Sequence, residues 1–209
     1  RYAVAIDMFH AGRLREKPSL LEADRYHGVI ITNTLPDDDQ FLAQARLPYT
    51  VVILGRRIRG YCCVLEAPDF VGRHSAEVLI EAGCRQPAVL HGRLLTSTTS
   101  NRLSAFVRTI EERTGRAPPI VISDGFQPSQ GAAALEAFFV AGGNLDGLYA
   151  VTDSLAVGAY QTLKRSGRQI PRDVAVVGVG DNELAEYFDP VSYTHLRAHE
   201  TKANLVCRL

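Results

Sequence analysis

Short runs rich in Val and Ile recur along this chain, and stretches with the spacing of helices separate them. A strand that is covered on both faces forms an unbroken apolar run, whereas a strand with one wet face alternates polar and apolar residues. Chains that alternate such buried strands with helices build parallel sheets with helices on their faces. The sequence therefore predicts an α/β fold with parallel sheets flanked by helices, and its expected strands are Ala3–Met8, Gly28–Thr32, Thr50–Gly55, Tyr61–Leu65, Ala88–His91, Ile120–Ser123, Gly147–Val151 and Val174–Val179.

Several amphipathic stretches end next to a glycine, which suits the left-handed conformation that closes many helices. Similar numbers of expected strands lie before and after the segment Gly83–Pro87. We therefore expect two lobes, residues 1–85 and 86–190, rather than one long sheet. The expected helices are Phe70–Ala82, Asn101–Arg113, Ser129–Val140 and Ser154–Ser166, followed by Gly83, Gly115, Gly142 and Gly167.

The charge balance argues against direct contact with nucleic acid. Lys and Arg total 23, and Asp and Glu also total 23, so the formal net charge is zero and does not attract phosphates strongly. The apolar runs are far shorter than the ~20 residues that span a bilayer, and no secretory leader is recognisable. We expect a cytoplasmic protein with no membrane partner.

Motifs of the common enzyme classes do not occur. The sequence has no P-loop, no G-x-S-x-G elbow and no G-x-G-x-x-G after its first expected strand. Its four cysteines lack the paired spacing and the His neighbours of zinc sites. The sequence therefore predicts a binding protein rather than an enzyme, with no metal and no cofactor.

An ordered series of short motifs carries a family resemblance over roughly residues 26 to 190. It begins with Asp69-x-x-Gly72 and continues with Arg102 ahead of Ala105-Phe106. It then passes through residues 145–159 (LDGLYAVTDSLAVGA) and 167–178 (GRQIPRDVAVVG). This series resembles the effector-binding domain of the lactose-repressor-like (LacI/GalR) family of transcription regulators, whose body is similar to periplasmic sugar-binding proteins.

The resemblance implies a two-lobed, type I periplasmic-binding-protein-like fold. The chain begins at what corresponds to the family's second strand, so the first lobe is expected to be incomplete and the DNA-binding helix-turn-helix to be missing. Residues 191–209 do not match the family and are expected to be a non-native tail.

As a function, the resemblance implies the sensing core of a repressor. A homodimer would bind operator DNA through the missing head, and a sugar or sugar derivative, less favourably a purine, would bind between the lobes and modulate that binding. The alternative is a periplasmic sugar-binding protein of a transport system.

Candidate ligand contacts follow the expected strands of the second half, because open α/β sheets bind ligands at the carboxyl ends of their strands. Arg102 follows the polar loop 96–101, and its guanidinium could donate to two hydroxyls or to a carboxylate. Phe126 lies beyond the strand 120–123, and its ring could stack on a pyranose or a purine. The alternatives are a surface arginine and a loop anchor.

Acidic residues supply the other candidates. Asp153 could accept hydrogen bonds from ligand hydroxyls or cap the following helix, in which case Thr152 beside it would face the ligand. Asp69 is either a helix N-cap or a cleft carboxylate. Asp181 follows the last strand, where the family often has two acidic residues, and Gly180 stands in the first of these two places.

Overall fold

The chain forms two compact units in a computed structural model, which describes residues 3–8, 12–65, 69–180, 193–196 and 204–206. One unit consists of Arg1–Glu66 with Lys202–Leu209, and the other of Ala67–Thr201. The division falls before helix α2 (Phe70–Glu81), whereas the sequence predicts it after this helix, between residues 85 and 86. The physical reason is that the apolar face of α2 packs into the core of the second unit.

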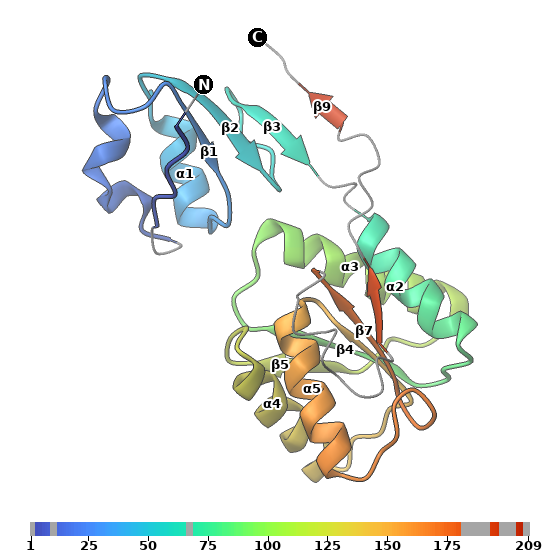
Figure 1. Cartoon of the computed structure of the whole chain (residues 1–209). Helices are drawn as coiled ribbons and strands as arrows, with labels where there is room; N and C mark the ends of the chain where they lie inside the picture. Colours follow the sequence, from blue (N-terminus) through green and yellow to red (C-terminus); the bar gives the residue numbers. More distant parts are fainter. Residues whose placement is uncertain (1–2, 9–11, 66–68, 181–192, 197–203, 207–209) are drawn as a thin grey trace. The chain divides into compact units, whose positions relative to one another are not determined.

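The first unit contains a sheet of order β1-β2-β3-β9 (Figure 1). Its strands β1 (Gly28–Ile31), β2 (Thr50–Leu54) and β3 (Cys62–Leu65) run parallel, and β9 (Asn204–Val206) pairs antiparallel with β3. Helix α1 (Pro36–Gln44) connects β1 to β2. The short 3-10 turns η1 (Leu14–Glu16) and η2 (Pro18–Leu21) precede β1. The core of this unit is small and consists of Leu14, Leu20, Ile31, Leu42, Val51, Ile53, Ile58 and Cys63.

The segment Ala3–Met8 is not a strand, so this prediction is wrong. Its side chains Val4, Ile6 and Met8 are 91%, 88% and 82% exposed. An extended segment becomes a strand only when a neighbour accepts and donates its backbone hydrogen bonds. In the described part of the chain, β1 pairs with β2 alone, and Ala3–Met8 has no strand beside it.

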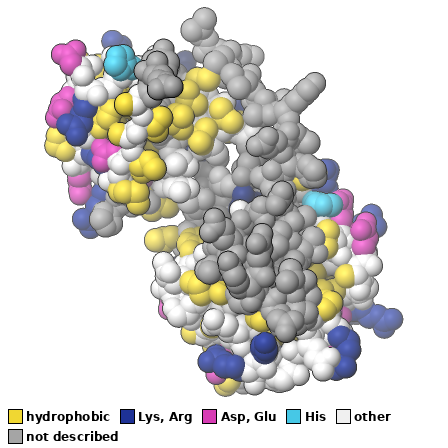
Figure 2. All heavy atoms as spheres, in the orientation of Figure 1, with side chains coloured by type: hydrophobic (Ala, Val, Ile, Leu, Met, Phe, Trp, Pro, Cys, Tyr) yellow, Lys and Arg dark blue, Asp and Glu magenta, His cyan; other side chains and the backbone are white. Residues whose placement is uncertain are grey.

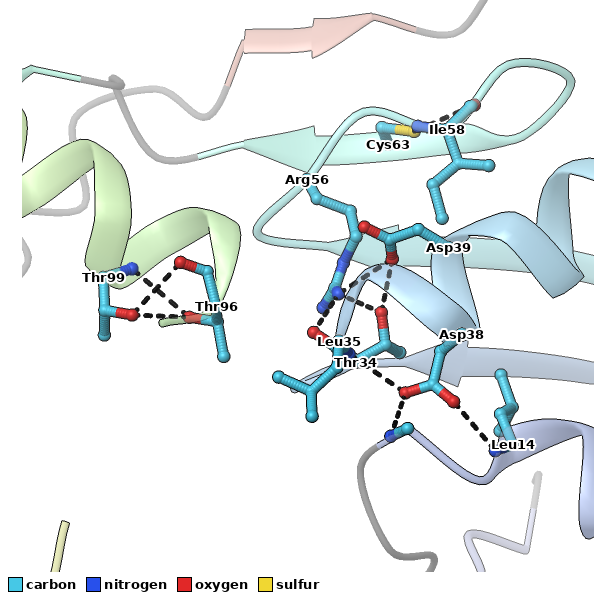
Figure 3. A network of polar contacts seen from close by, with 11 residues as sticks. Leu14, Thr34, Leu35, Asp38, Asp39, Arg56, Ile58, Cys63, Thr96 and Thr99 are labelled. Carbon is cyan, nitrogen blue, oxygen red and sulfur yellow. Dashed lines mark hydrogen bonds and ion pairs between the residues drawn. The ribbon is translucent and has the colours of Figure 1, made fainter. Parts of the chain in front are cut away.

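Two polar networks hold the ends of α1 and β2 together (Figure 3). The buried Asp38 carboxylate accepts hydrogen bonds from the backbone N–H groups of Gly12 at 2.6 Å, Leu14 at 2.8 Å and Leu35 at 3.0 Å. The buried Arg56 guanidinium, which follows β2, donates to Thr34 and to the Asp39 carboxylate. Except for the local bond from Leu35, these contacts join residues 17 or more positions apart in sequence, and they fix the connections around a small core.

The second unit contains a parallel sheet of order β5-β4-β6-β7-β8 (Figure 1). Helix α2 packs with α3 (Ser97–Thr114), and α4 (Pro128–Val140) packs with α5 (Asp153–Arg165), so that helix pairs flank the sheet. The predicted α/β class with parallel sheets is confirmed. The strands are β4 (Pro87–Gly92), β5 (Ile120–Ser123), β6 (Gly147–Ala150), β7 (Ala175–Val179) and β8 (Tyr193–Leu196).

The four predicted helices are present, with starts that differ by up to four residues. Helix α3 begins earlier than predicted because Thr96 caps it, accepting a hydrogen bond from Thr99 N (Figure 3). Gly83 closes α2 in the left-handed conformation, at φ +84°. The next residue, Cys84, donates its backbone N–H to Leu79 O at 3.0 Å, and burial raises the pKa of its thiol to about 11.

Strands β8 and β9 both fall within residues 191–209, the tail that the sequence analysis sets apart as non-native. The other residues of this tail lie outside the described ones. Whether the tail is native therefore stays a prediction.

Basic and acidic side chains intermingle on the face that Figure 2 shows, in agreement with the zero net charge of the sequence. Within the described residues, no helix is both long enough and apolar enough to cross a membrane.

Candidate functional site

The carboxyl ends of β5, β4, β6 and β7 lie next to one another along one edge of the second sheet, because these strands are parallel and adjacent in this order. This edge is where open α/β sheets bind ligands.

Arg102 reaches the end of β6 from the second turn of α3. Its Nη1 donates to the carbonyl oxygen of Val151 at 3.3 Å. Its backbone is fixed by close helix packing: a Cβ added to Gly72 of α2 would lie 2.1 Å from the Arg102 carbonyl oxygen. Only glycine leaves room for this approach. The glycine of the motif Asp69-x-x-Gly72 therefore allows α3, which carries Arg102, to pack closely against α2.

Asp153 is the first residue of α5 and lies directly beyond the Val151 carbonyl that Arg102 contacts. Its side chain is buried, with the residue only 3% exposed. The N-cap of α5 is Thr152, whose hydroxyl accepts a hydrogen bond from Leu155 N. From the sequence alone, Asp153 is an equally good candidate for this cap. The structure gives the cap to Thr152, because Thr152 is the residue with extended backbone angles before the first helical turn.

Gly180, at the end of β7, lies against the Asp153 carboxylate. A Cβ at Gly180 would be 3.2 Å from Asp153 Oδ2, and the residue has φ +139°, a conformation that favours glycine. The space beside Gly180 is therefore filled by the carboxylate of Asp153, the first residue of α5.

Phe126 lies over the end of β4. A Cβ at Gly92 would be 2.8 Å from both Cε2 and Cζ of the Phe126 ring. The ring is partly buried and packs against the core of the unit. Because β4 lies between β5 and β6, the ring and the Arg102–Asp153 group occupy neighbouring positions on the same edge.

Asp69 does not join this group. Asp69 holds the N-cap position of α2 without a side-chain capping bond, and its Oδ2 accepts from Arg108 Nη2 at 3.0 Å. Both side chains of this pair are about half exposed, so the pair contributes little to stability. Asp181 lies outside the described residues.

Two glycines are the functional positions that sequence reasoning missed. Gly92 directly follows the expected strand 88–91, and in the sequence Gly180 is only a departure from the family pattern. A glycine at a strand end indicates a close approach of some other group, but the sequence does not say which one. Only the folded structure identifies Phe126 as the neighbour of Gly92 and Asp153 as the neighbour of Gly180.

Among the described residues at this edge, Arg102 offers a cation, Asp153 a carboxylate, Thr152 a hydroxyl and Phe126 an aromatic ring. Such a set can hold a polar molecule by directional hydrogen bonds and by stacking on an apolar face. Within the described ranges, no group of His, Cys, Asp and Glu side chains is arranged to hold a metal ion.

Comparison with known proteins fits this geometry. The sequence profile of the periplasmic binding protein-like domain matches residues 76–206, which is more than half of the chain. The chain belongs to this family. The match covers the sheet edge with Arg102, Phe126 and Asp153, and it extends into the predicted tail as far as residue 206.

Curated relatives confirm the resemblance to LacI/GalR regulators. The ribose operon repressor of Haemophilus influenzae is 28% identical over 61% of this chain and 39% of its own length. The HTH-type transcriptional regulator CelR of Thermobifida fusca is 28% identical over 81% of this chain and 52% of its own length. The chain thus spans about half or less of these relatives. A solved complex of CelR with cellobiose has a TM-score of 0.69 and 25% identity, covering 81% of this chain and 54% of that one.

Proposed function

We propose that this chain is the ligand-sensing core of a DNA-binding transcriptional repressor and that it binds a sugar or a similar small metabolite. The observation that carries the proposal is the gathering of Arg102, Asp153 and Phe126 at the carboxyl edge of one parallel sheet. These residues lie in a domain whose curated relatives are named as repressors and regulators.

The chemistry of the three side chains favours a polyhydroxylated ligand. A guanidinium donates, a carboxylate accepts, and each sugar hydroxyl does both. The ring of Phe126 can cover the apolar face of a pyranose or of a purine. One relative is named for a ribose operon and one regulator was solved with cellobiose, which supports a sugar ligand.

The relatives also favour a cytoplasmic regulator over the alternative, a periplasmic sugar-binding protein of a transport system, and over an enzyme. In the proposed protein a homodimer binds operator DNA through a segment outside this chain. The ligand changes DNA affinity to the extent that it binds one conformation better than another, typically by about 1–3 kcal/mol.

The ligand site is tested by calorimetric titration of the chain with D-ribose, cellobiose and hypoxanthine. Arg102→Ala is expected to weaken binding by about 1.5–3 kcal/mol, because it removes a charged hydrogen-bond donor. Phe126→Leu is expected to weaken it as well, because a branched aliphatic side chain offers no flat face. Thermal melting of each variant should change little by comparison.

Arg108→Ala is the matched control, because Arg108 lies on the same helix but pairs with Asp69 at the surface. It should leave affinity unchanged. Unchanged affinity in Arg102→Ala and Phe126→Leu, for a ligand that the parent chain binds, would remove both residues from the site.

DNA binding is expected to be absent from this chain by itself. Its net charge is zero, and charged side chains of both signs mix on the face shown in Figure 2. In a mobility-shift experiment, residues 1–209 should not retard an operator fragment relative to a scrambled one. Sequence-specific retardation would place the DNA-reading surface within this chain and contradict the proposal.

A further inference from the structure

Gly92, at the end of a central strand, lies close against Phe126 of the proposed ligand group. Gly92 is the last residue of β4, is buried, and pairs in register with Ser123 of β5. A Cβ there would lie 2.8 Å from two ring atoms of Phe126 and 3.1 Å from a third. Carbon atoms in contact are normally about 3.5–4.0 Å apart. The ring therefore lies directly on the Cα of Gly92.

The backbone on both sides of Phe126 is held separately by Gln130 of α4. Gln130 Oε1 accepts a hydrogen bond from Gln127 N at 3.1 Å, and a Cβ at Gly125 would lie 2.4 Å from the same oxygen. The loop is thus hydrogen-bonded to α4 just after the aromatic residue and packs closely against Gln130 just before it. Because the backbone of the loop is held in this way, the position of the Phe126 ring depends on the residue against which it packs, Gly92.

We propose that Gly92 is a positioning residue. Because it has no side chain, the Phe126 ring can lie close to the end of β4, and the position of the ring determines which ligands can stack on it. The effect on binding rests on the proposed function, whereas the effect on the ring does not. Gly92 does not have the positive φ of the capping glycines, so alanine there meets the ring without meeting backbone strain. The ring, at the far end of its side chain, would give way by about 1 Å.

The experiment uses the fluorescence of a single introduced tryptophan. The chain has no tryptophan, so Phe126→Trp places the sole tryptophan at the proposed site. Adding Gly92→Ala to Phe126→Trp is expected to shift the emission to longer wavelength, because the ring is lifted off its support towards solvent. With the natural Phe126, Gly92→Ala is expected to weaken binding of D-ribose or cellobiose between about twofold and tenfold, the range of an aromatic contact.

Gly143→Ala is the matched control. A Cβ at Gly143 would lie 2.5 Å from the ring of Phe138, so it produces the same kind of clash. Gly143 lies between α4 and β6, at the opposite edge of the sheet, where β6 begins. This variant should alter neither the emission of Trp at position 126 nor the affinity for sugar.

A second comparison separates positioning from a general loss of structure. If Gly92 acts through the ring, Gly92→Ala should weaken binding in the parent chain but add nothing once Phe126→Leu has removed the ring. Equal losses in both backgrounds would overturn the proposal.

The two possible failures are distinguishable. An unchanged emission spectrum on adding Gly92→Ala overturns the positioning role, and so does a shifted spectrum with undiminished affinity for a sugar that the parent binds. If neither sugar binds the parent but the emission still shifts, Gly92 positions the ring as proposed, and it is the proposed sugar-binding function that fails.

Discussion

Gly158→Ala is expected to lower the free energy of unfolding of the second unit by about 3 kcal/mol. Gly158 of α5 faces α4, and a Cβ there would lie 1.9 Å from Pro128 O and 2.8 Å from Ala132 N. These are backbone atoms of the opposing helix, so relief requires moving a whole helix. Alanine favours a helix over glycine by about 1 kcal/mol, and the clash is expected to outweigh this gain. Urea denaturation followed by circular dichroism measures the difference.

Gly131→Ala provides a graded comparison at the same pair of helices. A Cβ at Gly131 would meet the Leu155 side chain at 2.9 Å but its backbone only at 3.3 Å. Because a side chain can rotate away, this variant should cost clearly less than Gly158→Ala. A Gly158→Ala chain as stable as the parent would show that α4 and α5 do not pack as closely as described.

Asp38→Ala is expected to destabilise the first unit by about 4 kcal/mol. The substitution leaves the backbone N–H groups of Gly12, Leu14 and Leu35 without the carboxylate that accepts from all three (Figure 3). Unsatisfied donors are costly where they are buried, as at Leu14, or partly buried, as at Gly12 and Leu35, and the hydrophobic core of this unit is small. Hydrogen exchange in peptides that cover residues 12–16 and 35–44 should accelerate strongly.

Asp37→Ala is its control on the same helical turn. Asp37 is exposed and acts on α1 only through the helix dipole, an effect of about 0.3–1 kcal/mol. Its exchange rates should stay near those of the parent. If both variants exchange alike, the Asp38 contacts do not hold the segment 12–14 to α1.

The candidate site was predictable in part. Arg102, Phe126 and Asp153 each follow an apolar run, and in a parallel sheet all such positions share one edge. Which residue does what was not predictable, because it depends on backbone angles and on distant contacts. Thr152 caps α5 in place of Asp153, and Asp69 pairs with Arg108 rather than with the edge group.

The sequence by itself determined the class of fold, since unbroken Val- and Ile-rich runs suit strands that are covered on both faces and glycines follow the helices. Only the tertiary structure decided what depends on partners distant in sequence. Ala3–Met8 has the pattern of a strand but no neighbour that pairs with it, and α2 joins the second unit because its apolar face packs there. The contacts of Gly92 and Gly180 were likewise decided by the tertiary structure. A glycine in the sequence does not show which distant group occupies the space that a side chain would fill.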